Sequence, residues 1–228
     1  LIRKEDKDID YNIFSRLGAE LKPGMIWVTS GATEIGRLDY LKRTGCELCG
    51  SDDEIKADYA AQGQSILMQN YRQFIHQEYG VRQLLVEHTH FNDPEKREHI
   101  RRLLIRAAQQ KTIPIVNYND PVSDEENRKM ELAIRRSHGD QVVECVDNDE
   151  TAAVLATAKS MEELEEKVRQ LQESCVGASR AGANGAKAKL EYALKSARQG
   201  TMVIIGHARH RLSDLVEGRV ACTRIGLE

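Results

Sequence analysis

The chain has 228 residues, 40% of them hydrophobic, which is enough for one well-buried domain. It has 33 basic and 36 acidic residues, a formal net charge of −3, and no segment that concentrates Lys and Arg with aromatics, so a nucleic-acid groove is disfavoured. No run approaches the ~18 apolar residues of a membrane span, and residues 1–10 are too charged for a secretory signal, so we expect a cytoplasmic protein with no membrane contact.

Short apolar runs rich in β-branched residues alternate with helical patterns along the chain. The predicted strands cover residues 25–29, 83–86, 113–116, 141–145 and 202–205. The predicted helices cover residues 57–77, 95–110, 160–175 and 190–199, with Gly200 as the C-cap of the last. Strands that alternate with helices imply an α/β fold, and we expect a three-layer α/β/α sandwich around a mainly parallel sheet.

The start of the chain and one internal segment lack strands that this pattern leads one to expect. No apolar strand opens the sequence, and residues 152–156 pass directly into residues 157–160. We therefore predict a single domain over residues 1–226 that lacks its first strand and a segment near residues 156–157. Residues 227–228 are predicted to be a tag remnant.

Five cysteines form an odd and sparse set, which is untypical of a secreted disulfide framework. Cys46 and Cys49 form a CxxC in a loop that carries Gly and Asp, but no second pair completes a zinc site. We predict free thiols and no metal site built from them.

The first candidate site segment is the predicted strand that runs into Ser30, Gly31 and Ala32. A turn of small residues at the carboxyl end of a strand exposes backbone N–H groups to an anion, and Ser30 adds a hydroxyl donor. A plain strand-to-helix turn that uses glycine for its conformation is the alternative interpretation.

The histidines show neither an HExxH motif nor a defensible ligand spacing, and His88 and His90 alternate at the end of a predicted strand, where they would share one face. We predict structural or exposed roles for them. The sequence also lacks a GxSxG nucleophile elbow, which argues against a hydrolase.

The second candidate segment follows the predicted strand at residues 113–116 and includes Asn117, Asn119 and Asp120. The carboxyl edge of a parallel sheet forms the ligand crevice of open α/β folds, and Asn with Asp can hold an ammonium group or orient a hydroxyl. An Asx-rich turn ahead of Pro121 is the alternative.

Two further segments carry charged or glycine-rich patterns. Residues 146–151, with Asp147, Asn148 and Asp149, could cap a helix, orient lysines or bind magnesium with a nucleotide. Residues 177–189 are rich in Gly and Ala and end in Lys187 and Lys189, so they could wrap phosphates or form a flexible linker. The GxxxxGK[ST] order of a Walker A loop is absent.

In this order the segments resemble the glutamate 5-kinase family of the amino-acid kinase superfamily. The matching motifs are VTSGA at residues 28–32, a lysine and AAxGQxxLMQ at residues 56 and 60–69, an aromatic-x-D turn at residues 91–93, PIxNxND at residues 114–120, DND at residues 147–149 and GAKAK at residues 185–189. Each is modest alone, but together they span nearly the whole chain.

The resemblance implies transfer of the γ-phosphoryl group of Mg-ATP to the side-chain carboxylate of glutamate, the first step of proline biosynthesis. It implies Lys189 and Asp149 as catalytic residues, with Asp149 orienting the lysines. The implied substrate-binding residues are Ser30, Gly31, Ala32, Asn119, Asp120 and Asn148. The implied ATP-binding residues are Ala183, Asn184, Gly185, Ala186, Lys187, Ala188 and Lys189. The resemblance also implies ATP and Mg²⁺ as cofactors and a homodimer or homotetramer.

Several departures from the family pattern leave other functions open. The opening strand with its lysine and a strand ending in Thr-Asp have no counterpart here, Tyr118 stands where the family has glutamate, and Asn184 stands where it prefers glycine. The alternatives are a sibling kinase acting on another small acid or phosphate, such as acetylglutamate, uridylate or fosfomycin, and a catalytically silent binding or regulatory homologue.

Overall fold

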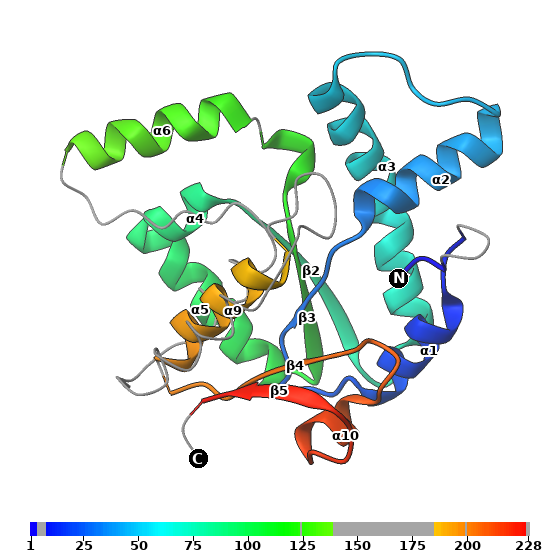
Figure 1. Cartoon of the computed structure of the whole chain (residues 1–228), viewed down its shortest axis with the longest axis vertical. Coiled ribbons are helices and arrows are strands. Elements are labelled where there is room, and N and C mark those ends of the chain that lie inside the picture. The colour runs from blue at the N-terminus through cyan, green and yellow to red at the C-terminus, as the bar shows by residue number, and fades with distance from the viewer. Residues whose placement is uncertain (4–7, 124, 139–184, 199, 227–228) are drawn as a thin grey trace. The chain divides into compact units, whose positions relative to one another are not determined.

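The computed structural model describes residues 1–3, 8–123, 125–138, 185–198 and 200–226. The chain divides into two compact units, Leu1–Asn148 and Asp149–Glu228, each of which is described by itself (Figure 1). The predictions at residues 141–145, 152–156 and 160–175 lie outside the described residues. The single domain over residues 1–226 stays a prediction.

A parallel three-stranded sheet forms the centre of the first unit. The strands are β1 (Trp27–Val28), β2 (Gly80–Val86) and β3 (Thr112–Tyr118), in the order β1-β3-β2. The central strand β3 is buried at every position, which explains the apolar run at residues 113–116 in its centre. The α/β class and the parallel sheet are therefore confirmed, whereas the three-layer sandwich stays a prediction.

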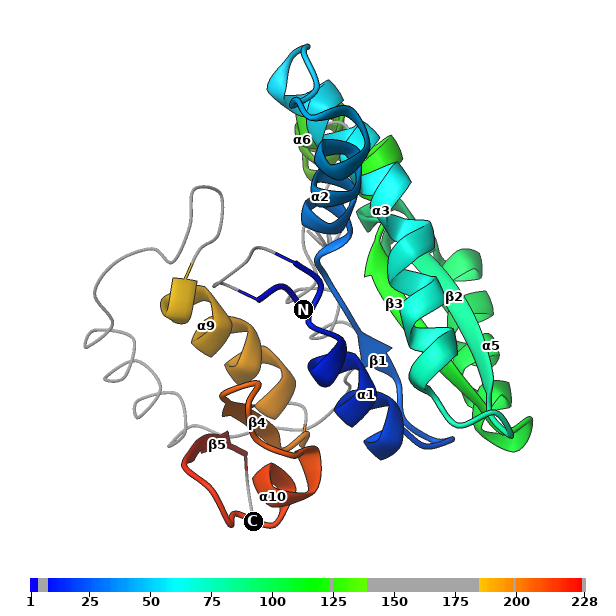
Figure 2. The ribbon, with the colours of Figure 1, turned by 90° about the vertical axis from the view of Figure 1, so that its right-hand side faces the viewer.

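Two long helices flank this sheet, and their starts follow from local sequence. The helix α3 (Asp52–Phe74) begins with a capping box in which Ser51 and Glu54 bond reciprocally. The helix α5 (Pro94–Gln109) begins after Asp93, whose side chain accepts from the amides of Glu95 and Lys96. Figure 2 shows α3 and α5 on opposite sides of β2 and β3. The helices predicted at residues 57–77 and 95–110 are thus confirmed, and α3 starts earlier than predicted.

The remaining helical elements of the first unit are shorter. They are α1 (Tyr11–Glu20), α2 (Ala32–Thr44), α4 (His88–Asn92), the 3-10 turn η1 (Asp120–Val122) and α6 (Glu125–Ser137). The helix α1 is capped by Asp10, whose side chain accepts from the amides of Asn12 and Ile13, and it packs on α3 through Phe14 against Tyr71. No periodic pattern predicted α1, because its apolar residues occupy only a short stretch.

The helices α2 and α3 cross with their backbones in direct contact. A Cβ on Gly63 would lie 1.8 Å from the carbonyl oxygen of Ala32, and one on Gly36 would lie 1.9 Å from that of Tyr59. Only glycine allows this approach, and it fixes the first residue of α2 against the middle of α3.

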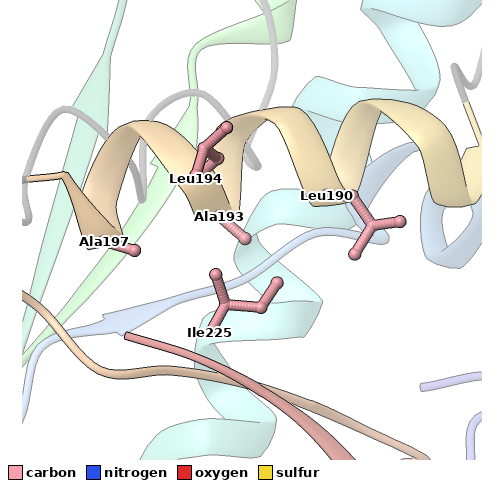
Figure 3. Close-up of a cluster of buried hydrophobic side chains, with 5 residues drawn as sticks. All are labelled: Leu190, Ala193, Leu194, Ala197 and Ile225. Atoms are coloured by element: carbon pink, nitrogen blue, oxygen red, sulfur yellow. The ribbon is translucent and has the colours of Figure 1, made fainter. Parts of the chain in front are cut away.

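The second unit has its own small core. The helix α9 (Gly185–Ala197) packs on a two-stranded antiparallel sheet of β4 (Val203–Gly206) and β5 (Cys222–Ile225), and α10 (Leu212–Val216) connects the two strands. Figure 3 shows the buried side chains of this core: Leu190, Ala193, Leu194, Ala197 and Ile225. Gly200 has a φ of 80° and its N–H donates to Ala197 O, so it lies in the turn that follows α9, three residues beyond the last helical residue; its prediction as the C-cap placed the helix end too far along the chain.

In the second unit one predicted strand is confirmed and one predicted loop is wrong. The strand expected at residues 202–205 is β4, which pairs antiparallel with β5, a partner that a short apolar run does not specify. Residues 185–189 were expected in a glycine-rich loop but belong to α9, since Ala and Lys are strong helix formers.

No helix in the described ranges is both long and apolar enough to cross a bilayer.

Candidate active site

The turn after β1 opens α2 with unusual backbone geometry. Gly31 is the N-cap of α2 with a φ of 102°, a left-handed conformation that favours glycine, and no side chain caps the helix start there. The first amides of an α-helix have no intrahelical partner and carry the positive end of its dipole. The turn of Ser30, Gly31 and Ala32 therefore presents donors suited to a carboxylate or phosphate.

A buried hydrogen-bond network holds this turn in place. The Thr29 N–H donates to Val116 O at 2.9 Å, and the Thr29 hydroxyl lies 2.6 Å from the hydroxyl of Tyr71. Trp27 Nε1 donates to the same Tyr71 oxygen at 2.8 Å, so the phenol proton is free to go to Thr29. Burial raises the pKa of Tyr71, so its hydroxyl stays protonated near neutral pH.

The end of β3 is fixed from α3 through two amide side chains. Asn117 Nδ2 donates to Gln64 Oε1 at 2.8 Å, and Asn117 Oδ1 accepts from the Tyr118 N–H at 3.0 Å. Both side chains are buried, and Gln64 Nε2 makes no hydrogen bond within the ranges that the structure describes. Gln64 was not among the predicted site residues, although it lies in the AAxGQ motif of this helix.

Beyond β3, Asn119 is held by a residue that sequence reasoning missed. Asn119 Nδ2 donates to Glu87 Oε1 at 2.6 Å, and the Asn119 N–H donates to Val86 O at 2.9 Å. Glu87 directly follows β2, whose last residue, Val86, pairs with Tyr118. In the sequence, Glu87 was visible only as an acidic residue at the end of a predicted strand. The register of β2 against β3 is what places it beside Asn119.

Tyr118 does not share the surroundings of its two neighbours. It is 3% exposed and its hydroxyl lies 2.9 Å from the Ser123 hydroxyl. Successive side chains of a strand point to opposite faces, so the Tyr118 ring lies on the other face from Asn117. Its phenol is therefore part of the protein interior.

The expectation that His88 and His90 share one face of a strand is wrong, because the chain turns into α4 immediately after Glu87. His88 is 4% exposed, and its Nε2 lies 2.9 Å from Oε2 of Glu131 on α6. His90 Nδ1 accepts from the Glu87 N–H at 2.9 Å. Both histidines therefore support the local structure around Glu87.

The loop between α2 and α3 carries Cys46 and Cys49, which are exposed free thiols. Glu47 anchors this loop: it accepts from the Tyr59 hydroxyl at 2.8 Å and pairs with Arg37, and these contacts lower the pKa of Glu47. Among the described residues no group of three His, Cys, Asp or Glu side chains could hold a metal ion.

The structure brings together one half of the predicted site. The strands β1 and β3 are adjacent and parallel, so the turn at Ser30, Gly31 and Ala32 and the turn at Asn119 and Asp120 lie at the same edge of the sheet. Of the other half, Asn148, Asp149, Ala183 and Asn184 lie outside the described residues. The remaining predicted residues start α9 in the second unit: Gly185, Ala186, Lys187, Ala188 and Lys189.

Comparison with known proteins finds three similar proteins, each named a glutamate 5-kinase. No protein-family model matches the chain. It is 29% identical to a glutamate 5-kinase of Geobacillus thermodenitrificans across 97% of the chain and 62% of that protein. It is 38% identical to one of Symbiobacterium thermophilum across 46% of the chain and 38% of that protein, and 29% identical to one of Geobacillus kaustophilus across 91% and 58%.

The chain therefore spans less than two thirds of the length of each of these relatives. Their similarity agrees with the motif order and with the parallel α/β sheet, and it supports a relationship between this chain and the amino-acid kinase family.

Proposed function

We propose that the chain is an ATP-dependent kinase that phosphorylates the side-chain carboxylate of glutamate, the first step of proline biosynthesis. The observation that carries the proposal is the edge of the sheet, where the uncapped start of α2 and the acidic turn at Asp120 follow neighbouring strands. Three glutamate 5-kinases among the relatives support the same activity.

The two turns have opposite polarity, which suits an amino acid. The amides after Gly31 and the Ser30 hydroxyl donate to a carboxylate, whereas the side-chain oxygens of Asn119 and Asp120 accept from an ammonium group. We assign substrate binding to Ser30, Gly31, Ala32, Asn119, Asp120 and Asn148. A substrate held between the turns would have its side-chain carboxylate positioned for reaction.

We assign the ATP phosphates to the start of α9 and the segment before it. The first amides of a 13-residue helix attract phosphate oxygens, and Lys187 and Lys189 add positive charge. The set comprises Ala183, Asn184, Gly185, Ala186, Lys187, Ala188 and Lys189.

In the reaction, an oxygen of the substrate carboxylate forms a bond to the γ-phosphorus while the bond to the bridging β–γ oxygen breaks, giving an acyl phosphate and ADP. Lys189 neutralises charge on the transferring group, and Asp149 orients the lysines. Mg²⁺ bound to the phosphate oxygens would neutralise further charge. No covalent enzyme intermediate is needed.

The test is ADP formation with glutamate, acetylglutamate, uridylate and fosfomycin as acceptors. Turnover of another acceptor but not glutamate would replace the substrate, and no turnover of any would favour a silent homologue. Lys189→Ala is expected to lower kcat by about 100-fold or more, because a charge that stabilises the transition state is lost. Lys195→Ala, an exposed lysine on the same helix, is the control and should leave kcat unchanged.

We further propose that the enzyme acts in the cytoplasm as a homodimer or homotetramer. Light scattering of the purified chain measures the assembly directly, and a monomer at the concentrations used for assay would contradict it.

A further inference from the structure

We propose that Glu87 is a positioning residue that fixes the Asn119 amide and makes the site select acceptors with a free ammonium group. The inference rests on the proposed function and adds a residue that none of the motifs contains. It concerns the part of the substrate that does not react.

The contact between the two side chains fixes which way the amide faces. Asn119 Nδ2 donates to Glu87 Oε1 at 2.6 Å, and the Asn119 backbone is anchored by its N–H to Val86 O. An ionised carboxylate only accepts hydrogen bonds, so Asn119 must turn its NH₂ group toward Glu87. Its carbonyl oxygen Oδ1 then faces away from Glu87, and it makes no hydrogen bond within the part of the chain that is described.

Glu87 is itself held by the surrounding structure. Its N–H donates to His90 Nδ1 at 2.9 Å, and the neighbouring His88 is buried with its Nε2 2.9 Å from Glu131. The register of β2 against β3 places Glu87 one residue beyond the pair Val86 and Tyr118. The Glu87–Asn119 contact is therefore built into the sheet edge and does not depend on a mobile surface side chain.

This arrangement collects acceptors and negative charge at one place. Asn119 Oδ1 lies next in sequence to the Asp120 carboxylate, and Glu87 adds a second carboxylate behind the amide. Together these oxygens stabilise an ammonium ion. An acylated nitrogen carries no charge to be stabilised, and a phosphate or carboxylate at the same place would be repelled. The site should therefore prefer a free amino acid to an acetylated acid or a nucleotide.

The test compares binding of L-glutamate with binding of glutarate, which has the same two carboxylates but no ammonium group, by calorimetry without ATP. The full chain is expected to bind L-glutamate more tightly. Glu87→Gln removes the constraint, because a Gln amide can donate as well as accept, and should lower the preference about tenfold, the size of one charge-assisted hydrogen bond.

Two further variants separate positioning from a general effect of charge. Glu87→Asp keeps an acceptor-only side chain and should restore part of the preference. Glu78→Gln makes the same charge change at an exposed site before β2, at the opposite end of that strand, and should change nothing.

An unchanged preference in Glu87→Gln, or equal binding of both ligands by the unmodified chain, would overturn the inference. If glutamate is still turned over when either result is found, the proposed kinase function is retained and only the role of Glu87 is rejected. Selective binding of L-glutamate without ADP formation would support the role of Glu87 and overturn the kinase.

Discussion

The two turns that meet at the edge of the parallel sheet are held in different ways. The turn after β1 is fixed by uncharged, buried contacts: Gly63 against Ala32, and Tyr71 with Thr29. The turn after β3 is fixed by contacts with carboxylates that are at least partly exposed: Glu87 accepts from Asn119, and Glu131 contacts the buried His88. The first should therefore be insensitive to salt, whereas the second should weaken as the salt concentration rises.

Gly63→Ala should break the first turn and give the largest effect. The added Cβ would lie 1.8 Å from Ala32 O, a backbone atom that cannot move without shifting α2. The expected loss of unfolding free energy is about 3 kcal/mol or more, measured by urea denaturation. Gly50→Ala is the control, because its Cβ would meet only side-chain atoms at 3.5 Å and beyond. Equal stability of the two variants would mean that α2 and α3 do not cross as described.

Tyr71→Phe tests the hydroxyl network of the same turn. The change leaves Trp27 Nε1 and the Thr29 hydroxyl without their common partner in a buried site. A loss of ~1–3 kcal/mol in unfolding free energy follows. Tyr40→Phe, on a ring whose hydroxyl makes no hydrogen bond among the described residues, should cost much less. Similar losses in both would argue against the network.

Glu131→Ala tests the second turn and should have a smaller effect. Glu131 is half exposed, so removing its contact with His88 should cost less than about 1 kcal/mol. Hydrogen exchange should become faster in α6 while α2 stays unchanged. Met130→Ala, at an exposed position on the same helix, is the comparison. Faster exchange in both helices would show that the two turns are not independent.

Acid titration of the loop between α2 and α3 should give the smallest effect. This loop is held by a carboxylate, as the turn after β3 is. Hydrogen bonding to Tyr59, and then to Arg37, lowers the pKa of Glu47 in the folded state. Its contribution is therefore complete above the unfolded-state pKa, about 4.3, and is lost as the pH falls through the lower folded-state value. Glu47→Gln should reduce the loss of stability on acidification below pH ~4, followed by circular dichroism. An identical acid transition in this variant would contradict the contact.

Much of the first unit was predictable from sequence because its signals are local. The continuous apolar run of β3 and the helical periodicity of α3 and α5 do not depend on distant residues. The turns at Ser30 and Asp120 were found because polar residues follow apolar strands.

What sequence reasoning missed depends on contacts between distant segments. Glu87 reaches Asn119 only through the register of two strands, and Gln64 reaches Asn117 only when α3 packs on the sheet. The antiparallel pairing of β4 with β5 was missed for a related reason, since a short apolar run does not identify its partner strand. The start of α9 was missed because glycines near Gly185 suggested a loop, although the following Ala and Lys residues favour a helix.

The bond between Trp27 and Tyr71 gives the chain an optical reporter of its own. Trp27 is the sole tryptophan, and it precedes Ser30 on the same short segment. Indole fluorescence depends on the polarity around the ring and on the hydrogen bond at Nε1. A ligand that displaces the segment should therefore alter the emission of the unlabelled protein, so titrations at this turn can be followed without a dye.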